Sequence, residues 1–191
     1  MFHLMRNFHL GLGLIFVLMA LVFAVSSLVI IYRPWLKPAP HDFESSIQLS
    51  PEAAMAPRAA ARELMTKHGF KGDLREIREQ GVVRFRIVRP GEQAEVQYVP
   101  AIGEAKIKVR RHGALDTMVQ LHTNHGLWHE YAPSNFWGAI SLFTSVGLLL
   151  LGATGIYLWL AHHSERLIGG ILLGFGLVYG LVTLLLTRLE G

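Results

Sequence analysis

The sequence predicts a membrane protein with three transmembrane helices and one small α+β domain between the first two. Of the 191 residues, 51% are hydrophobic, and they gather in three blocks without Asp, Glu, Lys or Arg: residues 10–32, 136–161 and 167–186. A helix needs about 20 apolar residues to cross a bilayer, so each block is long enough. Between the first two blocks, short apolar–charged alternations are broken by glycine and proline, which is typical of β-strands.

These patterns divide the chain into consecutive segments. They are an N-terminal transmembrane helix (1–35), a linker (36–46), an α+β domain (47–112), a juxtamembrane helix (113–135), and transmembrane helices two (136–161) and three (167–188). The alternative interpretation of the first segment is a cleaved signal peptide, since Ala24-Val25-Ser26 resembles a cleavage site. Its apolar run outlasts the about 7–15 residues of a signal peptide's core, so we expect an uncleaved anchor.

Composition limits the chemistry and suggests an orientation. Cysteine is absent, which excludes disulfides, Fe–S clusters, thiol catalysis and c-type haem attachment. The formal net charge is +4. Arg6 and Arg166 flank the apolar blocks on one side, and the positive-inside rule assigns that side to the cytoplasm, although Arg33 and Lys37 oppose this bias. We therefore expect the α+β domain on the extracytoplasmic side.

The α+β domain is expected to contain one helix packed on a four-stranded antiparallel sheet. Ser50-Pro51-Glu52 is typical of a helix start, with Pro57 as either a kink or the true start, and Lys67-His68-Gly69 is typical of a helix end. Strands are expected at residues 74–78, 82–89, 94–99 and 105–110. Their alternation places apolar side chains towards the helix.

The other face of this sheet is expected to be basic. It carries Arg84, Arg86, Lys106, Lys108 and Arg110, with Glu95 and Gln97 between them. Such a face either docks anionic lipid headgroups or an acidic partner, or is a solvated surface in which Glu95 pairs with its neighbours. The lipid bilayer and other membrane or periplasmic subunits are the expected partners. Nothing in the sequence indicates nucleic-acid binding.

Three histidines precede the second transmembrane block. His122, His125 and His129 are spaced i, i+3 and i+7, so a helix running from Ala114 to His129 would present all three on one face. Such a set can bind zinc or copper, or one member can ligate haem iron. The alternative is that these are interfacial histidines, hydrogen-bonded to Asn124, Glu130 or backbone carbonyls.

A second set of histidines is His9, His162 and His163. With three alternating spans, the start of the first and the end of the second lie on the same membrane side, where an imidazole pair could hold a b-type haem. The alternative is that His9 is interfacial and the other two are loop residues. No span has an internal histidine, so a haem would sit at a membrane edge or be shared with another polypeptide.

Glycines dominate the third block. Gly170 and Gly174, and then Gly176 and Gly180, are spaced four apart, which permits close approach of a neighbouring helix. In the second block, Ser141, Ser145, Leu148, Gly152 and Gly155 form a stripe of mainly small residues. These faces either pack the two helices together or meet a second subunit.

Three motifs resemble the PepSY-associated transmembrane family of bacterial inner membranes. Arg6-x-x-His9-x-Gly11 resembles its entry into the first span. Residues 47–111 resemble one PepSY domain, with LSPEAA at the helix start and VPAIGE in place of the D-x-x-T-G-E turn. Leu121-His122, Trp137-Gly138 and TGIYLW at residues 154–159 resemble its LH…G…TGxYLW span.

The resemblance implies two functions. Some larger members are haem-bearing reductases, for example of ferric siderophores, and this implies haem b at His9 and His122 in an electron-transfer or metal-reduction system. With one PepSY unit and three spans, this chain is expected to be an accessory protein and not an enzyme on its own. PepSY domains also occur in protease propeptides, which implies the alternative of a non-catalytic module regulating an extracytoplasmic protease or assembling an envelope complex.

Overall fold

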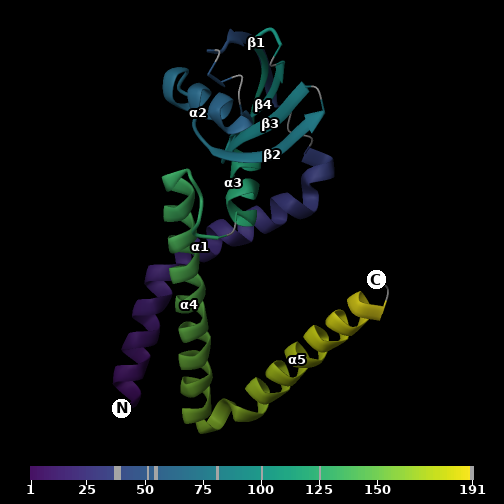
Figure 1. Cartoon of the computed structure of the whole chain (residues 1–191). Helices are drawn as coiled ribbons and strands as arrows, with labels where there is room; N and C mark the ends of the chain where they lie inside the picture. The colour runs from purple at the N-terminus through teal and green to yellow at the C-terminus, as the bar shows by residue number, and fades with distance from the viewer. Residues whose placement is uncertain are drawn as a thin grey trace. The chain divides into compact units, whose positions relative to one another are not determined.

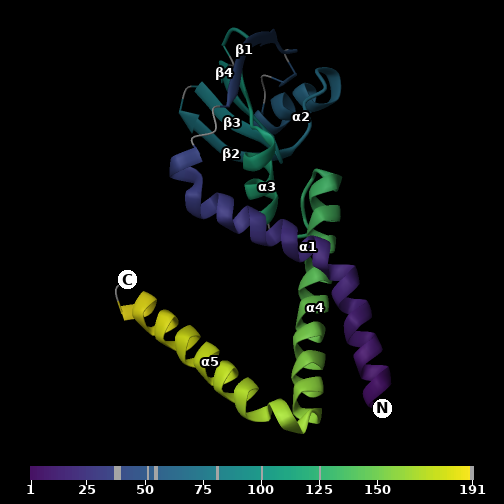
Figure 2. The same cartoon turned by 180° about the vertical axis from the view of Figure 1, so that it is seen from behind.

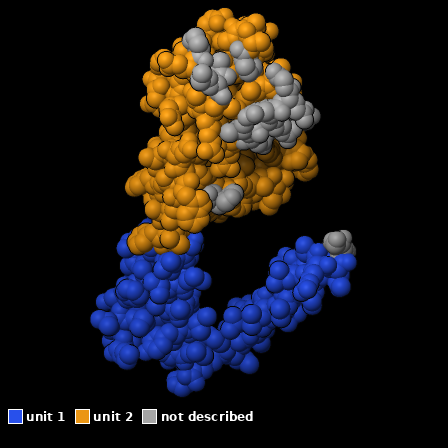
Figure 3. Space-filling model, in the orientation of Figure 1, with its two compact units in different colours: residues 1–18, 144–191 blue, residues 19–143 orange. Residues whose placement is uncertain are grey.

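The computed structural model describes residues 1–36, 40–50, 52–53, 56–80, 82–99, 101–124 and 126–189, without the side chains of residues 76–80 and 165. The chain divides into two compact units, one of residues 1–18 and 144–191 and one of residues 19–143 (Figure 3). Two long helices pass from one unit into the other. These are α1 (Phe2–Leu36) and α4 (Ala132–Ala161).

The described part of the chain contains three helices long and apolar enough to cross a membrane. They are α1, α4 and α5 (Arg166–Leu189), with mean hydropathies of 3.1, 1.9 and 2.2 over their most apolar stretches. The three predicted blocks therefore form three separate helices, as expected. A short 3₁₀ turn, η2 (His163–Glu165), separates α4 from α5.

The sheet in residues 19–143 has five antiparallel strands, not the four expected, in the order β1-β5-β4-β3-β2 (Figures 1 and 2). Their bounds are β1 His41–Gln48, β2 Asp73–Gln80, β3 Val82–Arg89, β4 Glu92–Val99 and β5 Glu104–Arg111. The additional strand, β1, lies mostly in the segment predicted as a linker. Its sequence HDFESSIQ is mainly polar because β1 is an edge strand. It pairs with β5 along its whole length.

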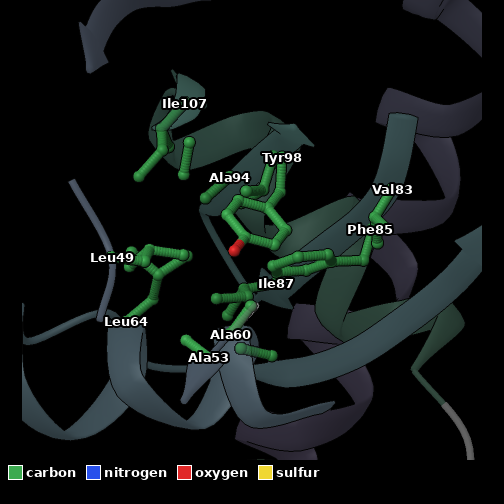
Figure 4. Packing of buried hydrophobic residues seen from close by; sticks show 13 residues of the cluster. Leu49, Ala53, Ala60, Leu64, Val83, Phe85, Ile87, Ala94, Tyr98 and Ile107 are labelled. Carbon is green, nitrogen blue, oxygen red and sulfur yellow. The ribbon is translucent and has the colours of Figure 1, made fainter. Parts of the chain in front are cut away.

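The core of the domain lies between one face of the sheet and helix α2 (Pro57–Lys67) (Figure 4). Ala60, Ala61 and Leu64 of α2 are almost completely buried there. The sheet contributes Val83, Phe85, Ile87, Ala94, Val96, Tyr98, Ala105 and Ile107. The predicted helix on an antiparallel sheet is therefore present, with the predicted apolar face towards it.

The helix begins at Pro57, which occupies the first turn, where proline costs no hydrogen bond. The predicted start at Ser50 is wrong, because Ser50 instead donates from Oγ to Glu63 Oε2 at 2.6 Å. The predicted end is correct. Gly69 has φ of +75°, a conformation that favours glycine, and Phe70 N–H donates to Leu64 O.

Helix α3 (Ala114–Thr123) is shorter than expected. The prediction of one helix through His129 is wrong, since Asn124 has extended dihedrals and Gly126 has φ of +93°. Asn124 is the C-terminal cap of α3, and α4 begins only at Ala132. The residues between the two helices form a connector, defined as residues 124–131, whose described members lie outside any helix.

In the unit of residues 1–18 and 144–191, the first half of α1 lies antiparallel to the second half of α4. Gly13 lies near Leu151, and the ring of Phe16 lies against Gly147. The start of the first span and the end of the second are thus on the same side, as expected. In α5, a Cβ added at Gly174, Gly176 or Gly180 would meet no atom within 4 Å.

Candidate functional site

His9 of α1 is hydrogen-bonded to Thr154 of α4. The distance from His9 Nδ1 to Thr154 Oγ1 is 2.9 Å. Gly155 follows Thr154, and a Cβ at that position would lie only 3.3 Å from His9 Cε1. Position 155 therefore leaves room for the imidazole. The R-x-x-H-x-G and TGIYLW motifs, 145 residues apart, meet at this contact.

The Thr154 hydroxyl determines which nitrogen of His9 carries a proton. This hydroxyl lies 2.8 Å from Leu150 O and 3.0 Å from Leu151 O, so it donates its proton to the helix backbone. Its oxygen then accepts from the ring, which places the proton of neutral His9 on Nδ1. The other ring nitrogen, Nε2, keeps its lone pair and can bind a metal ion or haem iron.

A groove of about 360 Å³ lies beside this imidazole, within the same unit. Apart from His9, its lining consists of Leu10, Gly13, Leu14, Val17 and Leu151. These residues are aliphatic or glycine. The groove thus offers an apolar surface next to one nitrogen ligand.

His122, in the last turn of α3, has a similar arrangement in the other unit. Its Nδ1 lies 2.7 Å from Ser26 Oγ of α1. Ser26 is 1% exposed, and its hydroxyl lies 2.9 Å from Phe23 O, to which it donates. The proton of neutral His122 is therefore on Nδ1, and Nε2 is the nitrogen with a lone pair.

Aromatic side chains fix the His122 ring further. Phe23 meets it edge-to-face, with ring centroids 5.1 Å apart. Trp137 of α4 lies on Phe23 at 6.2 Å, and its Nε1 donates to Leu121 O at 2.8 Å. One imidazole is thereby held by three helices of the unit, α1, α3 and α4.

His129 lies in the connector and not on the face of a helix. Its Nδ1 is 2.6 Å from Asp73 Oδ2 at the start of β2, and the two side chains are only 6% and 12% exposed. The second carboxylate oxygen of Asp73 accepts from Tyr131 N–H at 2.8 Å. Asn135 completes the network, accepting from His129 N–H and donating to His129 O, both at 2.8 Å. This network ties the connector to the sheet.

The structure does not gather the predicted triad of histidines. His122 and His129 belong to different elements with separate partners, and His125 lies outside the described residues. Among the described residues, no three His, Asp, Glu or Cys side chains are placed to hold one metal ion. The prediction from the i, i+3, i+7 spacing is wrong because α3, which would have aligned the three histidines on one face, ends at Thr123.

The predicted pairing of His9 with His162 or His163 is not formed either. His9 contacts Thr154, which is eight residues before His162, or about 12 Å of helix. His162 and His163 are exposed, and His163 Nε2 lies 3.4 Å from Arg166 Nη2. Both residues belong to the turn between α4 and α5. This agrees with the alternative interpretation that they are loop residues.

The outer face of the sheet is of mixed charge. β1 adds two acids that the four-stranded prediction lacked: Asp42 contacts Arg110 at 3.2 Å and Lys108 at 3.3 Å, and Glu44 contacts Lys108 at 3.6 Å. The hydrogen bond from Arg110, together with Lys108, lowers the pKa of Asp42 despite some desolvation. This neutralises much of the predicted basic face around β5.

Sequence reasoning missed Ser26, Asp73, Asn135 and the role of Thr154. All four are polar groups that bind a histidine, and Ser26, Asp73 and Thr154 do so from a distant part of the chain. Ser26 and Thr154 carried a signal, because each is a hydroxyl inside an apolar helix block and must find a partner there. The sequence gives no signal that Asp73 binds a histidine, since acids at strand starts are common.

Comparison with known proteins finds no matching family model, no matching curated protein and no matching solved structure. The resemblance to PepSY-associated proteins stays a prediction. The site is therefore interpreted from its own geometry.

Proposed function

We propose that this protein is an inner-membrane accessory protein that binds haem b, or a metal ion, through His9 and His122. In this proposal it serves an electron-transfer or metal- and siderophore-reduction system, with its α+β domain on the extracytoplasmic side. One observation carries the proposal. Both histidines have Nδ1 fixed by a hydroxyl that itself donates to a helix backbone, which leaves Nε2 as a ligand atom.

This arrangement is typical of histidines that ligate metals. A ligating imidazole usually donates its other N–H to an acceptor, which fixes both tautomer and ring orientation. Here the acceptors are Thr154 and Ser26, both buried.

The residues around His9 fit a porphyrin in their chemistry. The groove is apolar except for the imidazole, and an apolar surface suits the macrocycle of a porphyrin. Among the groove's lining residues, His9 would hold the group through its one free ring nitrogen. A bound haem b would supply one-electron transfer. The protein's own residues would orient the ligand nitrogen and keep water from that side.

The first experiment is a reduced-minus-oxidised absorption spectrum of the full chain purified in mild detergent, with elemental analysis for metals. We expect a b-type haem band or a stoichiometric metal. His9→Ala and His122→Ala should each lower the content, whereas His163→Ala, in the exposed turn, should not. Absence of both haem and metal from protein grown with excess haem and metal would overturn the proposal.

A partner capture with residues 47–111 present and deleted addresses the alternative function. A cofactor-free protein whose partners depend on the domain would favour the interaction module. A cofactor-bearing protein whose partners are unaffected by the deletion would favour the haem proposal.

A further inference from the structure

Two consecutive residues of the connector, Leu127 and Trp128, present exposed apolar side chains. Trp128 is 89% exposed and Leu127 is 41% exposed. Neither the histidine sites nor the core of the α+β domain uses them. Their position beside α4 indicates what covers them.

Leu127 lies beside the first apolar turn of α4. A Cβ added at Gly138 would lie 2.5 Å from Gly126 O and 3.0 Å from Leu127 Cδ2, so the connector passes directly over Gly138. The apolar block of α4 begins at Phe136, two residues before this glycine. The block of residues 136–161 is longer than the about 20 residues that cross the hydrocarbon core, so its first turn lies in the interfacial layer. Leu127 is therefore at the edge of the hydrocarbon.

His129 lies on the polar side of that edge. Its N–H donates to Asn135 Oδ1 and its C=O accepts from Asn135 Nδ2, both at 2.8 Å. His129 is thus level with the residue just before the apolar block. Asn135 and Gly138 are separated by three residues of helix, or about 4.5 Å along the axis. Because Trp128 follows Leu127 and precedes His129, it lies at the boundary between the two levels.

The connector is fixed on both sides of Trp128. After it, His129 Nδ1 lies 2.6 Å from Asp73 Oδ2, and Tyr131 N–H donates to the same carboxylate at 2.8 Å. Before it, Gly126 has φ of +93°, and a Cβ added there would lie 3.1 Å from Trp128 Nε1, so the indole rests against this glycine. The exposed indole is therefore presented by a segment that the fold holds in place.

We infer that Leu127 and Trp128 form an anchor that inserts into the interface of the lipid bilayer beside α4. Tryptophan concentrates at this boundary because its ring is apolar while its N–H can donate to headgroups or water. Leu127 adds apolar area on the hydrocarbon side. The exposed acid Glu130 follows His129 and so lies on the polar side. The inference requires that α4 crosses a membrane and does not depend on haem binding.

The anchor would link the bilayer surface to the sheet. Trp128 is followed at once by His129, which Asp73 holds at the start of β2. The α+β domain is connected along the chain to α1 before β1 and to α3 after β5. Insertion of Trp128 would add a third attachment, through β2.

The first test measures fluorescence quenching of Trp128 with the full chain in phosphatidylcholine nanodiscs. The chain has four tryptophans, so the Trp128 signal is the difference between wild type and Trp128→Phe. We expect lipids brominated near the top of the acyl chain to quench this signal more than lipids brominated near the chain end, and acrylamide in the water to quench it weakly. Quenching by acrylamide alone would overturn the inference and would favour a docking surface for a protein partner.

The second test measures the labelling rate of a single thiol. Because the chain has no cysteine, Trp128→Cys introduces one reactive site, at an exposed position that the fold does not need. We expect a water-soluble maleimide to label it at least about tenfold more slowly in nanodiscs than Arg62→Cys on the exposed face of α2, because an apolar environment disfavours the thiolate. Equal labelling rates for the two variants would contradict insertion of the connector.

Discussion

His9 Nδ1 and Thr154 Oγ1, 2.9 Å apart, join two helices through residues that lie 145 positions apart in the sequence. The threonine donates to its own helix and accepts from the histidine, so a single hydroxyl sets the tautomer of the ring. Thr154 therefore positions the His9 ring, and in the proposed function it would orient the nitrogen that binds the ligand.

Thr154→Val keeps the shape of the side chain and removes the acceptor. We expect unfolding in detergent to become easier by about 1 kcal/mol. Any cofactor bound at His9 should be lost more readily on washing. Thr183→Val is the control, because its hydroxyl also donates to a carbonyl one turn earlier, Tyr179 O, but contacts no histidine. Equal effects of the two changes would contradict a role for Thr154 in orienting His9.

Ser26 and Ser27 provide a matched pair for His122. Both hydroxyls donate to Phe23 O, at 2.9 and 2.8 Å, but only Ser26 reaches His122. Ser26→Ala should free the ring and let its proton exchange between the two nitrogens, whereas Ser27→Ala should not. Nitrogen NMR of histidine-labelled protein reports the tautomer directly. A His122 that already populates both tautomers in wild type would refute the assignment.

Asp73→Ala should destabilise the sheet unit. The change leaves His129 and Tyr131 N–H without their acceptor in a buried environment, which costs at least about 2 kcal/mol. Asp42→Ala, whose ion pairs to Lys108 and Arg110 are half-exposed, should cost much less. Urea unfolding followed by tryptophan fluorescence compares the two. A smaller loss for Asp73→Ala than for Asp42→Ala would contradict the structural role given to the network.

The pKa of Glu63 is lowered below its ordinary value of 4.5, first by the hydrogen bond from the Ser50 hydroxyl and then by Lys67. A depressed carboxyl pKa means that the charged form favours the folded state. Its contribution is present above pH 4.5 and is lost as the pH falls through the folded pKa. Glu63→Gln should thus lower stability at neutral pH and match wild type in acid. Ser50→Ala should move the acid limb to higher pH. Parallel stability curves for all three proteins would contradict this linkage.

Tyr98→Phe should leave the domain as stable as wild type or more stable. The Tyr98 hydroxyl is buried in the core without a hydrogen-bond partner among the described residues, and burial raises the pKa of that hydroxyl. Removing an unsatisfied hydroxyl of this kind recovers about 1 kcal/mol. The measurement is the thermal unfolding midpoint, with Tyr157→Phe in α4 as control. A clear loss of stability would show that the hydroxyl is satisfied in solution.

The sequence was sufficient for the parts of the fold that follow from periodicity. Uninterrupted apolar length predicted α1, α4 and α5, and alternation around Phe85 and Ile107 predicted the buried face of the sheet. It failed for β1, because an edge strand needs few apolar residues and its pairing with β5 depends on residues about 65 positions away. Helix α3 was extended too far because histidine spacing was interpreted without the left-handed conformation at Gly126.

The candidate site was predictable only in part. His9 and His122 emerged from motif resemblance, and both proved to be held by buried hydroxyls. The hydrogen bonds themselves were not predictable, since Ser26 and Thr154 meet their histidines only when distant helices pack.

Strands β1 and β5 form the two ends of the α+β domain in the chain, and His41 pairs with Arg111 where they enter and leave it. Both connections to the hydrophobic helices therefore attach at the same end of one antiparallel strand pair. Tension between those connections would peel β1 from β5 one residue pair at a time, starting at His41 and Arg111, instead of shearing all pairs together. Under such tension the strand pair would separate progressively from the end where both connections attach. The ion pairs of Asp42 would be the next contacts to break.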